Sequence, residues 1–202
     1  MSEPTAVDRL YDEANATIAL LRNSSELSLQ VAASDHFRKA LLLAAASYFE
    51  DRVCNAVLEF IRERAKGSIL IENFVRNKAI ARQYHSWFAW EGNNANQFFA
   101  LFGAEFRTLM GARVKDSGEL HSSVRAFLEL GNERNRLVHQ NYATFAMEKT
   151  LDEVYDLYQR SRAFVEALPV AFKDGDGGVG EQDNGDTVVV AGGACPLPTA
   201  ED

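Results

Sequence analysis

Apolar residues recur at steps of three, four and seven along most of the first 172 residues, which is the spacing of one face of an α-helix. The clearest pattern covers residues 120–142 and predicts a helix of about six turns. Its apolar stripe consists of Val124, Phe127, Leu128, Gly131, Val138 and Tyr142. Arg134 and Asn135 stand where this stripe calls for apolar side chains, and His139 follows Asn135 by four residues. We therefore predict that this helix carries three polar groups on or beside its packing surface.

The same spacing predicts further helices, separated by polar or glycine-containing breaks. Their expected ranges are 5–22, 34–66, 69–88, 95–110 and 150–168. Ser34 or Asp35 is expected to cap the second of these helices, whose residues 40–49 are apolar nearly all round and predict a buried centre. Thr150 and Glu153 form a capping-box pattern, and Pro169 is expected to end the last helix. The predicted fold class is an all-α bundle.

Composition predicts one globular domain, residues 1–172, followed by a disordered acidic tail, residues 173–202. The chain has 202 residues, of which 47% are hydrophobic and 25% charged, whereas the tail is rich in Gly and Asp. No run of about 18 apolar residues occurs, and Met1–Pro4 lack the pattern of a signal peptide. Cys54 and Cys195 are the only cysteines, which fits a reducing compartment. We expect a cytoplasmic protein that does not enter a membrane.

The net charge of −8 lies mainly in the tail, since residues 173–202 carry −6 of it. The nearly neutral domain does not predict a broad basic surface for nucleic acid, so any RNA contact should be local. Arg107, Arg113 and Lys115 form a small basic cluster that is a candidate for positioning phosphate. A solvated helix face explains this cluster equally well.

Several chemistries lack their sequence patterns. There is no Gly-rich phosphate loop, no His-Glu-x-x-His, no Cys-x-x-Cys and no Gly-x-Ser-x-Gly elbow. His36, His85 and His121 lack metal-ligand spacing and are expected to be structural or surface residues, so we predict neither a metal nor a cofactor. An aromatic group that can stack on bases comprises Trp87, Trp90, Phe98, Phe99 and Phe102. Aromatic residues at helical spacing more often belong to the core.

Arg134 needs an explanation because a cation on a packing surface requires a partner anion, an open cleft or a subunit boundary. A salt-bridged or snorkelling surface arginine is the simplest alternative. Glu50 or Asp51, which follow the buried part of the second helix, can supply the counter-charge, and we favour Glu50. Alternatively, both carboxylates face water or pair with Arg52 and Arg62.

The run from Arg134 to His139 resembles the Arg-x4-6-His signature of the HEPN superfamily of all-helical domains, in which a polar residue such as Asn135 commonly follows the arginine. The segments Ala44–Glu50 and Lys78–Phe88 are similar to segments of the RiboL-PSP-HEPN branch, and the similarity spans roughly residues 30–167. This resemblance implies a HEPN-like helical bundle. It also implies metal-independent endoribonuclease activity, which many members of the superfamily have.

A histidine beside an arginine suits cleavage of RNA through its own 2′-hydroxyl. The His139 imidazole can accept a proton from that hydroxyl or donate one to the leaving oxygen, and the Arg134 guanidinium can stabilise charge on the phosphorane. The resemblance implies the same roles, with Asn135 orienting phosphate or imidazole. Tyr142 is a further candidate contact, although two residues separate it from His139 and the His-x-Tyr pattern of the family has one. Glu50, Arg113 and Lys115 complete the predicted substrate-binding residues.

Arg134 and His139 are about 140° apart around an ideal helix, so one protomer does not bring both groups to one phosphate. We therefore predict a homodimer with a composite site, the arrangement for which HEPN domains are known, lined by the interrupted apolar stripe. The biological setting is open: a toxin restrained by a cognate antitoxin protein, or an antiviral effector. The alternative function is a non-catalytic HEPN module that dimerises or binds a nucleotide as a sensor or scaffold.

Overall fold

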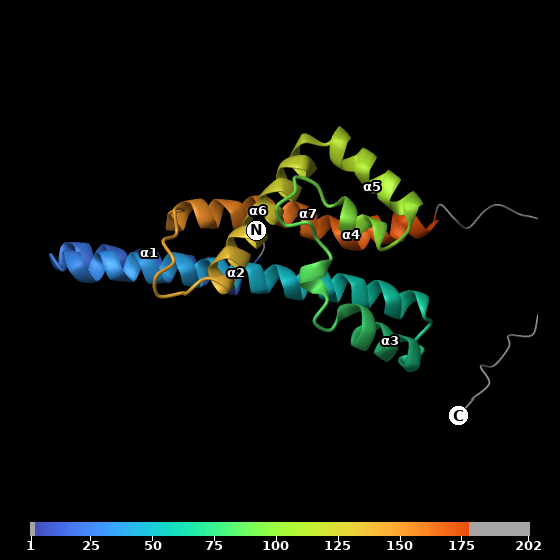
Figure 1. Cartoon of the computed structure of the whole chain (residues 1–202), viewed down its shortest axis with the longest axis horizontal. Helices are drawn as coiled ribbons and strands as arrows, with labels where there is room; N and C mark the ends of the chain where they lie inside the picture. The colour runs from blue at the N-terminus through green and yellow to red at the C-terminus, as the bar shows by residue number, and fades with distance from the viewer. Residues whose placement is uncertain (1–2, 178–202) are drawn as a thin grey trace, which may run out of the picture.

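The structure, a computed structural model, describes residues 3–177, and its longest helix is α2 (Leu27–Arg64). Helices α1 (Ala6–Asn23), α6 (Gly118–His139) and α7 (Leu151–Gly177) pack against α2, and no strand occurs within residues 3–177 (Figure 1). The shorter elements are α3 (Ile69–Val75), a π-helical turn (Arg76–Ile80), a 3-10 turn (Tyr84–Ser86), α4 (Asn96–Ala100) and α5 (Ala104–Asp116). The predicted all-α bundle is confirmed.

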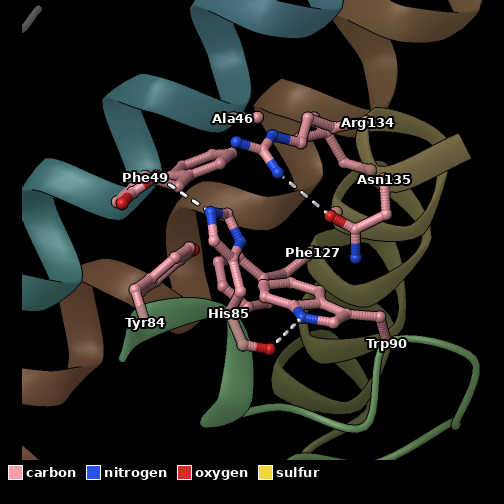
Figure 2. A pocket seen from close by; sticks show the side chains of 11 residues that line it. Ala46, Phe49, Tyr84, His85, Trp90, Phe127, Arg134 and Asn135 are labelled. Atoms are coloured by element: carbon pink, nitrogen blue, oxygen red, sulfur yellow. Dashed lines mark hydrogen bonds and ion pairs between the residues drawn. The ribbon is translucent and has the colours of Figure 1, made fainter. Parts of the chain in front are cut away.

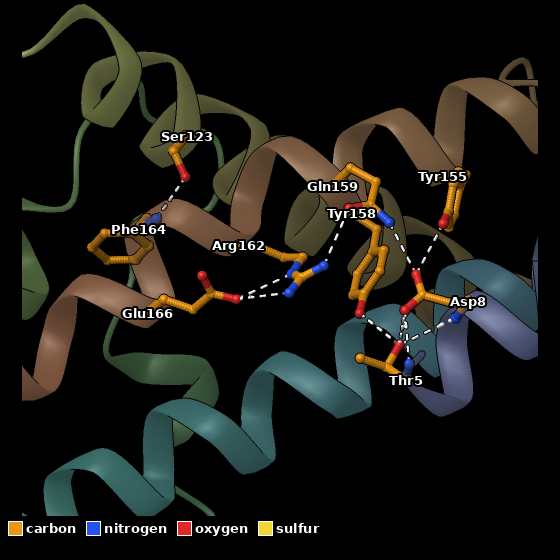
Figure 3. Close-up of polar contacts among 9 residues, drawn as sticks. All are labelled: Thr5, Asp8, Ser123, Tyr155, Tyr158, Gln159, Arg162, Phe164 and Glu166. Atoms are coloured by element: carbon orange, nitrogen blue, oxygen red, sulfur yellow. Dashed lines mark hydrogen bonds and ion pairs between the residues drawn. The ribbon is translucent and has the colours of Figure 1, made fainter. Parts of the chain in front are cut away.

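The core lies where α6 and α7 meet the middle of α2. Phe49 of α2 packs against Phe127 of α6 and Tyr158 of α7, with ring centroids 5.8 and 5.4 Å away, and Phe164 lies 5.1 Å from Phe127. These four aromatic residues are at most 1% exposed. Leu41, Leu42 and Ala45 of α2 are also buried, which confirms the predicted buried centre of this helix. Where α6 and α7 cross, the buried hydroxyl of Ser123 accepts a hydrogen bond from the Phe164 N–H at 2.7 Å (Figure 3).

The start of α1 is joined to α7 by polar contacts (Figure 3). Thr5 caps α1 in a capping box with Asp8, and its hydroxyl lies 2.8 Å from the Tyr158 hydroxyl. The Asp8 carboxylate also accepts hydrogen bonds from Tyr155 and Gln159, both at 2.9 Å. These bonds pair buried and half-buried polar groups across the α1–α7 contact, which fixes the register of the two helices.

The predicted start of the second helix was wrong. Ser34 and Asp35 lie inside α2, which begins at Leu27, soon after the turn at Ser25. Asp35 does not cap the helix; its carboxylate pairs with Arg38 and with the buried Lys39 one helical turn later. The Ser34 hydroxyl donates a hydrogen bond to the Gln30 carbonyl oxygen at 2.8 Å, so neither candidate acts as a cap.

Two predicted helices are interrupted. Residues 69–88 form α3 and the π-helical turn, and the chain then reverses at Arg82, whose φ is 62°. Residues 95–110 are divided by Gly103, whose φ of 102° is accessible to glycine but costly for other residues. The aromatic residues of this region belong to the core as expected, because Trp87, Phe98 and Phe99 are at most 5% exposed.

The ends of α6 and α7 also differ from prediction. Helix α6 ends at His139, so Tyr142 lies in the connector that follows. Helix α7 begins at the predicted Thr150–Glu153 capping box but continues through Pro169 to Gly177. The reason is packing: Phe172, beyond the proline, is 2% exposed and stacks on Phe60 of α2 at 5.2 Å. This burial outweighs the lost backbone hydrogen bond of the proline.

The predicted boundary between domain and tail at 172/173 remains a prediction, and most of the predicted tail, residues 178–202, lies outside the described residues. Within residues 3–177, no helix combines the length and the apolar composition needed to span a bilayer.

Candidate functional site

Helix α6 carries Arg134, Asn135 and His139 at its C-terminal end. Arg134 and Asn135 are half-buried and His139, the last helical residue, is exposed. The Arg134 guanidinium donates a hydrogen bond to the Asn135 side-chain oxygen at 3.2 Å. Gly131, one turn before Arg134, and Phe127, two turns before it, are buried, so packing of α6 on the core fixes the position of this polar end.

Arg134 lines a narrow pocket between α2, α6 and the turn around Tyr84 (Figure 2). Its wall includes the polar side chains of Glu50, Tyr84, His85, Arg134 and Asn135. The pocket has room for about one water molecule, so a nucleotide cannot enter it. A phosphate oxygen or a hydroxyl can reach its mouth, however, because the side chains of Glu50 and His85 are 41% and 43% exposed.

His139 lines a second, wider cleft of about 400 Å³ with Glu91 and Asn132. Asn135 and Trp90 line both this cleft and the narrow pocket. Arg134 and His139 of one protomer therefore lie on opposite sides of Asn135, as the helical geometry predicts, and they share neither pocket. The wider cleft is large enough for a base or a ribose.

The predicted counter-charge, Glu50, lies in the Arg134 pocket but does not pair with Arg134. Its Oε2 is 4.0 Å from Nε2 of His85. Among residues 3–177, no carboxylate oxygen lies within 4.0 Å of an Arg134 nitrogen. The guanidinium thus keeps donors available for an external anion, and phosphate is a suitable one.

His85 is the site residue that sequence reasoning missed. We expected it to be a structural or surface residue of a long helix, but the chain leaves the helix at Ala81 and returns toward α6. Figure 2 shows the His85 ring directed toward the guanidinium of Arg134. Burial and the charges of Arg134 and His139 lower the pKa of His85, whereas the charge of Glu50 opposes this shift.

Trp90 supports the turn that carries His85. Its indole N–H donates a hydrogen bond to the His85 carbonyl oxygen at 2.8 Å. The ring lies directly on Gly131 of α6: a Cβ atom at that position would be 2.1 Å from Trp90 Cζ3. Glycine is therefore required at position 131 for the indole, and with it the His85 backbone, to approach the helix this closely.

The other predicted substrate-binding residues do not line the Arg134 pocket. The carbonyl oxygen of Tyr142 accepts a hydrogen bond from buried Lys39 at 3.1 Å, and the Tyr142 ring lies over the same ammonium group. Arg113 pairs with Asp174 at 3.0 Å. Lys115 lines a separate cavity at the start of α6. Only Glu50 of this predicted set lies beside Arg134, and binding roles for the other three remain predictions.

The predicted dimer-lining stripe is also corrected. Most of its residues, including Val124, Phe127 and Leu128, are at most 1% exposed within the protomer and so cannot contact a second copy. Only Val138 and Tyr142, at the end of the stripe, are exposed, by 44% and 40%.

Comparison with known families supports the identity suggested by the Arg134–His139 run. The family model of RiboL-PSP-HEPN matches residues 8–174, which includes every helix from α2 to α6. The chain belongs to this family. HEPN domains are often ribonucleases, and they commonly dimerise and bind RNA. Neither the search of curated proteins nor the search of solved structures gave a match to this RiboL-PSP-HEPN chain.

Proposed function

We propose that this RiboL-PSP-HEPN protein is an endoribonuclease that cleaves RNA by attack of the 2′-hydroxyl, without a metal ion. The observation that carries the proposal is the half-buried Arg134, which has no carboxylate within 4.0 Å among residues 3–177. His139 lies in the neighbouring cleft, on the other side of Asn135. The guanidinium can neutralise charge that develops on the phosphorane, and the imidazole can transfer a proton. Asn135, which is bonded to Arg134 and lines both pockets, is suited to orient the phosphate.

The direct test is cleavage of an end-labelled single-stranded RNA in the presence of EDTA. Wild-type protein should give fragments with 2′,3′-cyclic phosphate or 3′-phosphate ends, because the nucleophile belongs to the RNA. His139→Ala should slow cleavage by about 10²–10⁴-fold through loss of a proton-transfer group. Arg134→Ala should slow it by about 10²–10³-fold through loss of transition-state stabilisation.

Arg125→Ala is the matched control, since Arg125 is an exposed arginine on the same helix, away from both pockets. It should cleave at the wild-type rate. Cleavage that depends absolutely on a divalent ion would refute the mechanism. Binding of RNA or a nucleotide without any cleavage would favour the sensor or scaffold module instead.

We further propose that the active form is a homodimer in which His139 of one protomer serves the Arg134 pocket of its partner. The separation of Arg134 and His139 into two pockets supports this proposal, as do the exposed Val138 and Tyr142 beside them. A two-fold axis near the end of α6 would place the two half-sites across one cleft. A toxin or antiviral effector, with or without a cognate antitoxin, would act through this same endoribonuclease activity.

A further inference from the structure

The pocket that Arg134 lines also contains the imidazole of His85. Nε2 of His85 lies 4.0 Å from Glu50 Oε2, and Arg134 and Asn135 line the opposite wall of the pocket. The His85 side chain is 43% exposed, so a substrate can reach it. The turn that carries it is held in place by the hydrogen bond from Trp90 and by Tyr84, which is 5% exposed beneath it.

We propose that His85 is a further catalytic residue of the RNA cleavage proposed above, acting as the general base beside Arg134 while a His139 imidazole acts as the general acid. His85 removes the proton of the 2′-hydroxyl, and the 2′-oxygen forms a bond to phosphorus. The bond from phosphorus to the 5′-oxygen breaks, and His139 donates a proton to that oxygen. The products are a 2′,3′-cyclic phosphate and a 5′-hydroxyl. His85 then carries the proton of the former 2′-hydroxyl, and the proton of His139 is on the 5′-oxygen.

The environments of the two histidines favour this division of roles. Three charged groups act on the pKa of His85, namely Glu50 from α2 and Arg134 and His139 from α6, and the ring of Tyr84 packs against it at 5.5 Å. Burial and the two positive groups lower the pKa of His85, so its imidazole is neutral and able to accept a proton at pH 7. His139 lies in the last turn of α6 and is exposed, so its imidazole can reach an oxygen of an RNA bound outside its own protomer.

Glu50 is a positioning residue in this scheme. A carboxylate facing Nε2 favours the tautomer with its proton on that nitrogen, which leaves the Nδ1 lone pair to accept the substrate proton. The 4.0 Å separation is longer than a hydrogen bond. Catalytic hydrogen bonds commonly shorten when substrate binds, and a water can also bridge this distance.

The test compares two RNA substrates, one natural and one with sulfur in place of the leaving 5′-oxygen. A thiolate leaves without a proton, since thiols have pKa values near about 8.5, so the sulfur substrate makes the general acid unnecessary. His139→Gln should be slowed about 10²–10⁴-fold on the natural substrate and should recover on the sulfur substrate. His85→Gln should be slowed by a similar factor on both substrates.

His36→Gln is the control because His36 is an exposed histidine on α2 outside both pockets, and it should match wild type. The His85 side chain donates or accepts no hydrogen bond within residues 3–177, so His85→Gln should fold. If His85→Gln does not fold, His85→Asn serves as a second variant. Circular dichroism measures the helical content of both variants.

The pH profile gives an independent measurement. In wild-type protein the rate should rise with pH through a midpoint below 6.5, the ordinary pKa of histidine, as His85 loses its proton. Because Glu50 raises the pKa of His85, Glu50→Gln should move this midpoint to lower pH, and a purely structural role would not move it.

The outcomes separate the two proposals. Wild-type protein that cleaves RNA while His85→Gln cleaves it equally well would overturn the role of His85 and leave the ribonuclease proposal standing. Recovery of His85→Gln on the sulfur substrate would also overturn the assignment as general base. Wild-type protein that cleaves no RNA would overturn both.

Discussion

Replacing Gly131 with alanine should displace Trp90 and the His85 backbone that it holds, without changing any polar side chain of the site. An added Cβ would lie 2.1 Å from Cζ3 and 2.2 Å from Cε3 of Trp90. Carbon atoms in contact are about 3.5–4.0 Å apart, so the indole must retreat by roughly 1.5 Å. Its hydrogen bond to the His85 carbonyl, now 2.8 Å, would then lengthen or break. The expected consequence is a displaced His85 and lower activity.

The size of the stability effect follows from two opposing contributions. Overpacking a filled site costs about 1–3 kcal/mol, whereas alanine gains about 0.5–1 kcal/mol over glycine inside a helix. We therefore expect Gly131→Ala to lower the free energy of unfolding by about 1–2 kcal/mol. For a domain of this size, the melting temperature should fall by roughly 2–8 °C.

Gly111→Ala in α5 is the matched control. The nearest atom to a Cβ at that position is Asn96 Oδ1 at 3.8 Å, an ordinary contact, so this change should stabilise the protein by about 0.5–1 kcal/mol. Urea unfolding of both variants gives the comparison, and Trp90→Leu combined with Gly131→Ala closes a double-mutant cycle. The alanine penalty should shrink once the indole is gone. If Gly131→Ala is as stable as Gly111→Ala, the proposed contact between Trp90 and α6 is wrong.

Two further predictions concern the connector after α6 and the assembly. Lys39→Met removes the 2.7 Å ion pair with Asp35 and the hydrogen bond to the Tyr142 carbonyl, so urea unfolding should show a loss of about 1–3 kcal/mol; an unchanged stability would contradict this role. In a composite dimer, a mixture of Arg134→Ala and His139→Ala proteins should regain part of the activity that each lacks alone, and specific activity should fall on dilution; a fully inactive mixture of the two would refute a composite site.

Local sequence signals predicted the parts of the fold that local chemistry determines. The Thr150–Glu153 capping box forms as expected, with Thr150 N–H donating to the Glu153 carboxylate at 2.7 Å. The helix predicted over residues 120–142 is α6, which begins two residues earlier, at Gly118, and ends three residues earlier, at His139. The polar end of that helix was recognised because Arg134 and Asn135 interrupt an apolar stripe. Each of these signals depends on residues that are close together in the sequence.

Tertiary packing determined the features that local signals did not predict. Pro169 is a strong helix terminator by itself, but Phe172 beyond it is buried against α2 and the helix continues. Asp35 is a good cap by residue type, but the ammonium group of Lys39 is buried and requires a partner anion. In both cases burial of a neighbouring side chain outweighs a preference of about 1–3 kcal/mol.

The position of His85 shows why half of the candidate site could not be predicted from spacing. The periodicity of residues 69–88 favours a continuous helix, and no glycine or proline marks the reversal at Arg82. The φ of Arg82 is 62°, a value that residues other than glycine rarely adopt. One available signal was Gly131, a glycine inside the apolar stripe of α6. A missing side chain in a packed stripe means that another group fills the space, and here that group is Trp90. Because Trp90 binds the His85 carbonyl oxygen, Gly131 on α6 determines where His85 lies. The site between α2, the turn at Tyr84–Ser86 and α6 therefore depends on a residue that has no side chain.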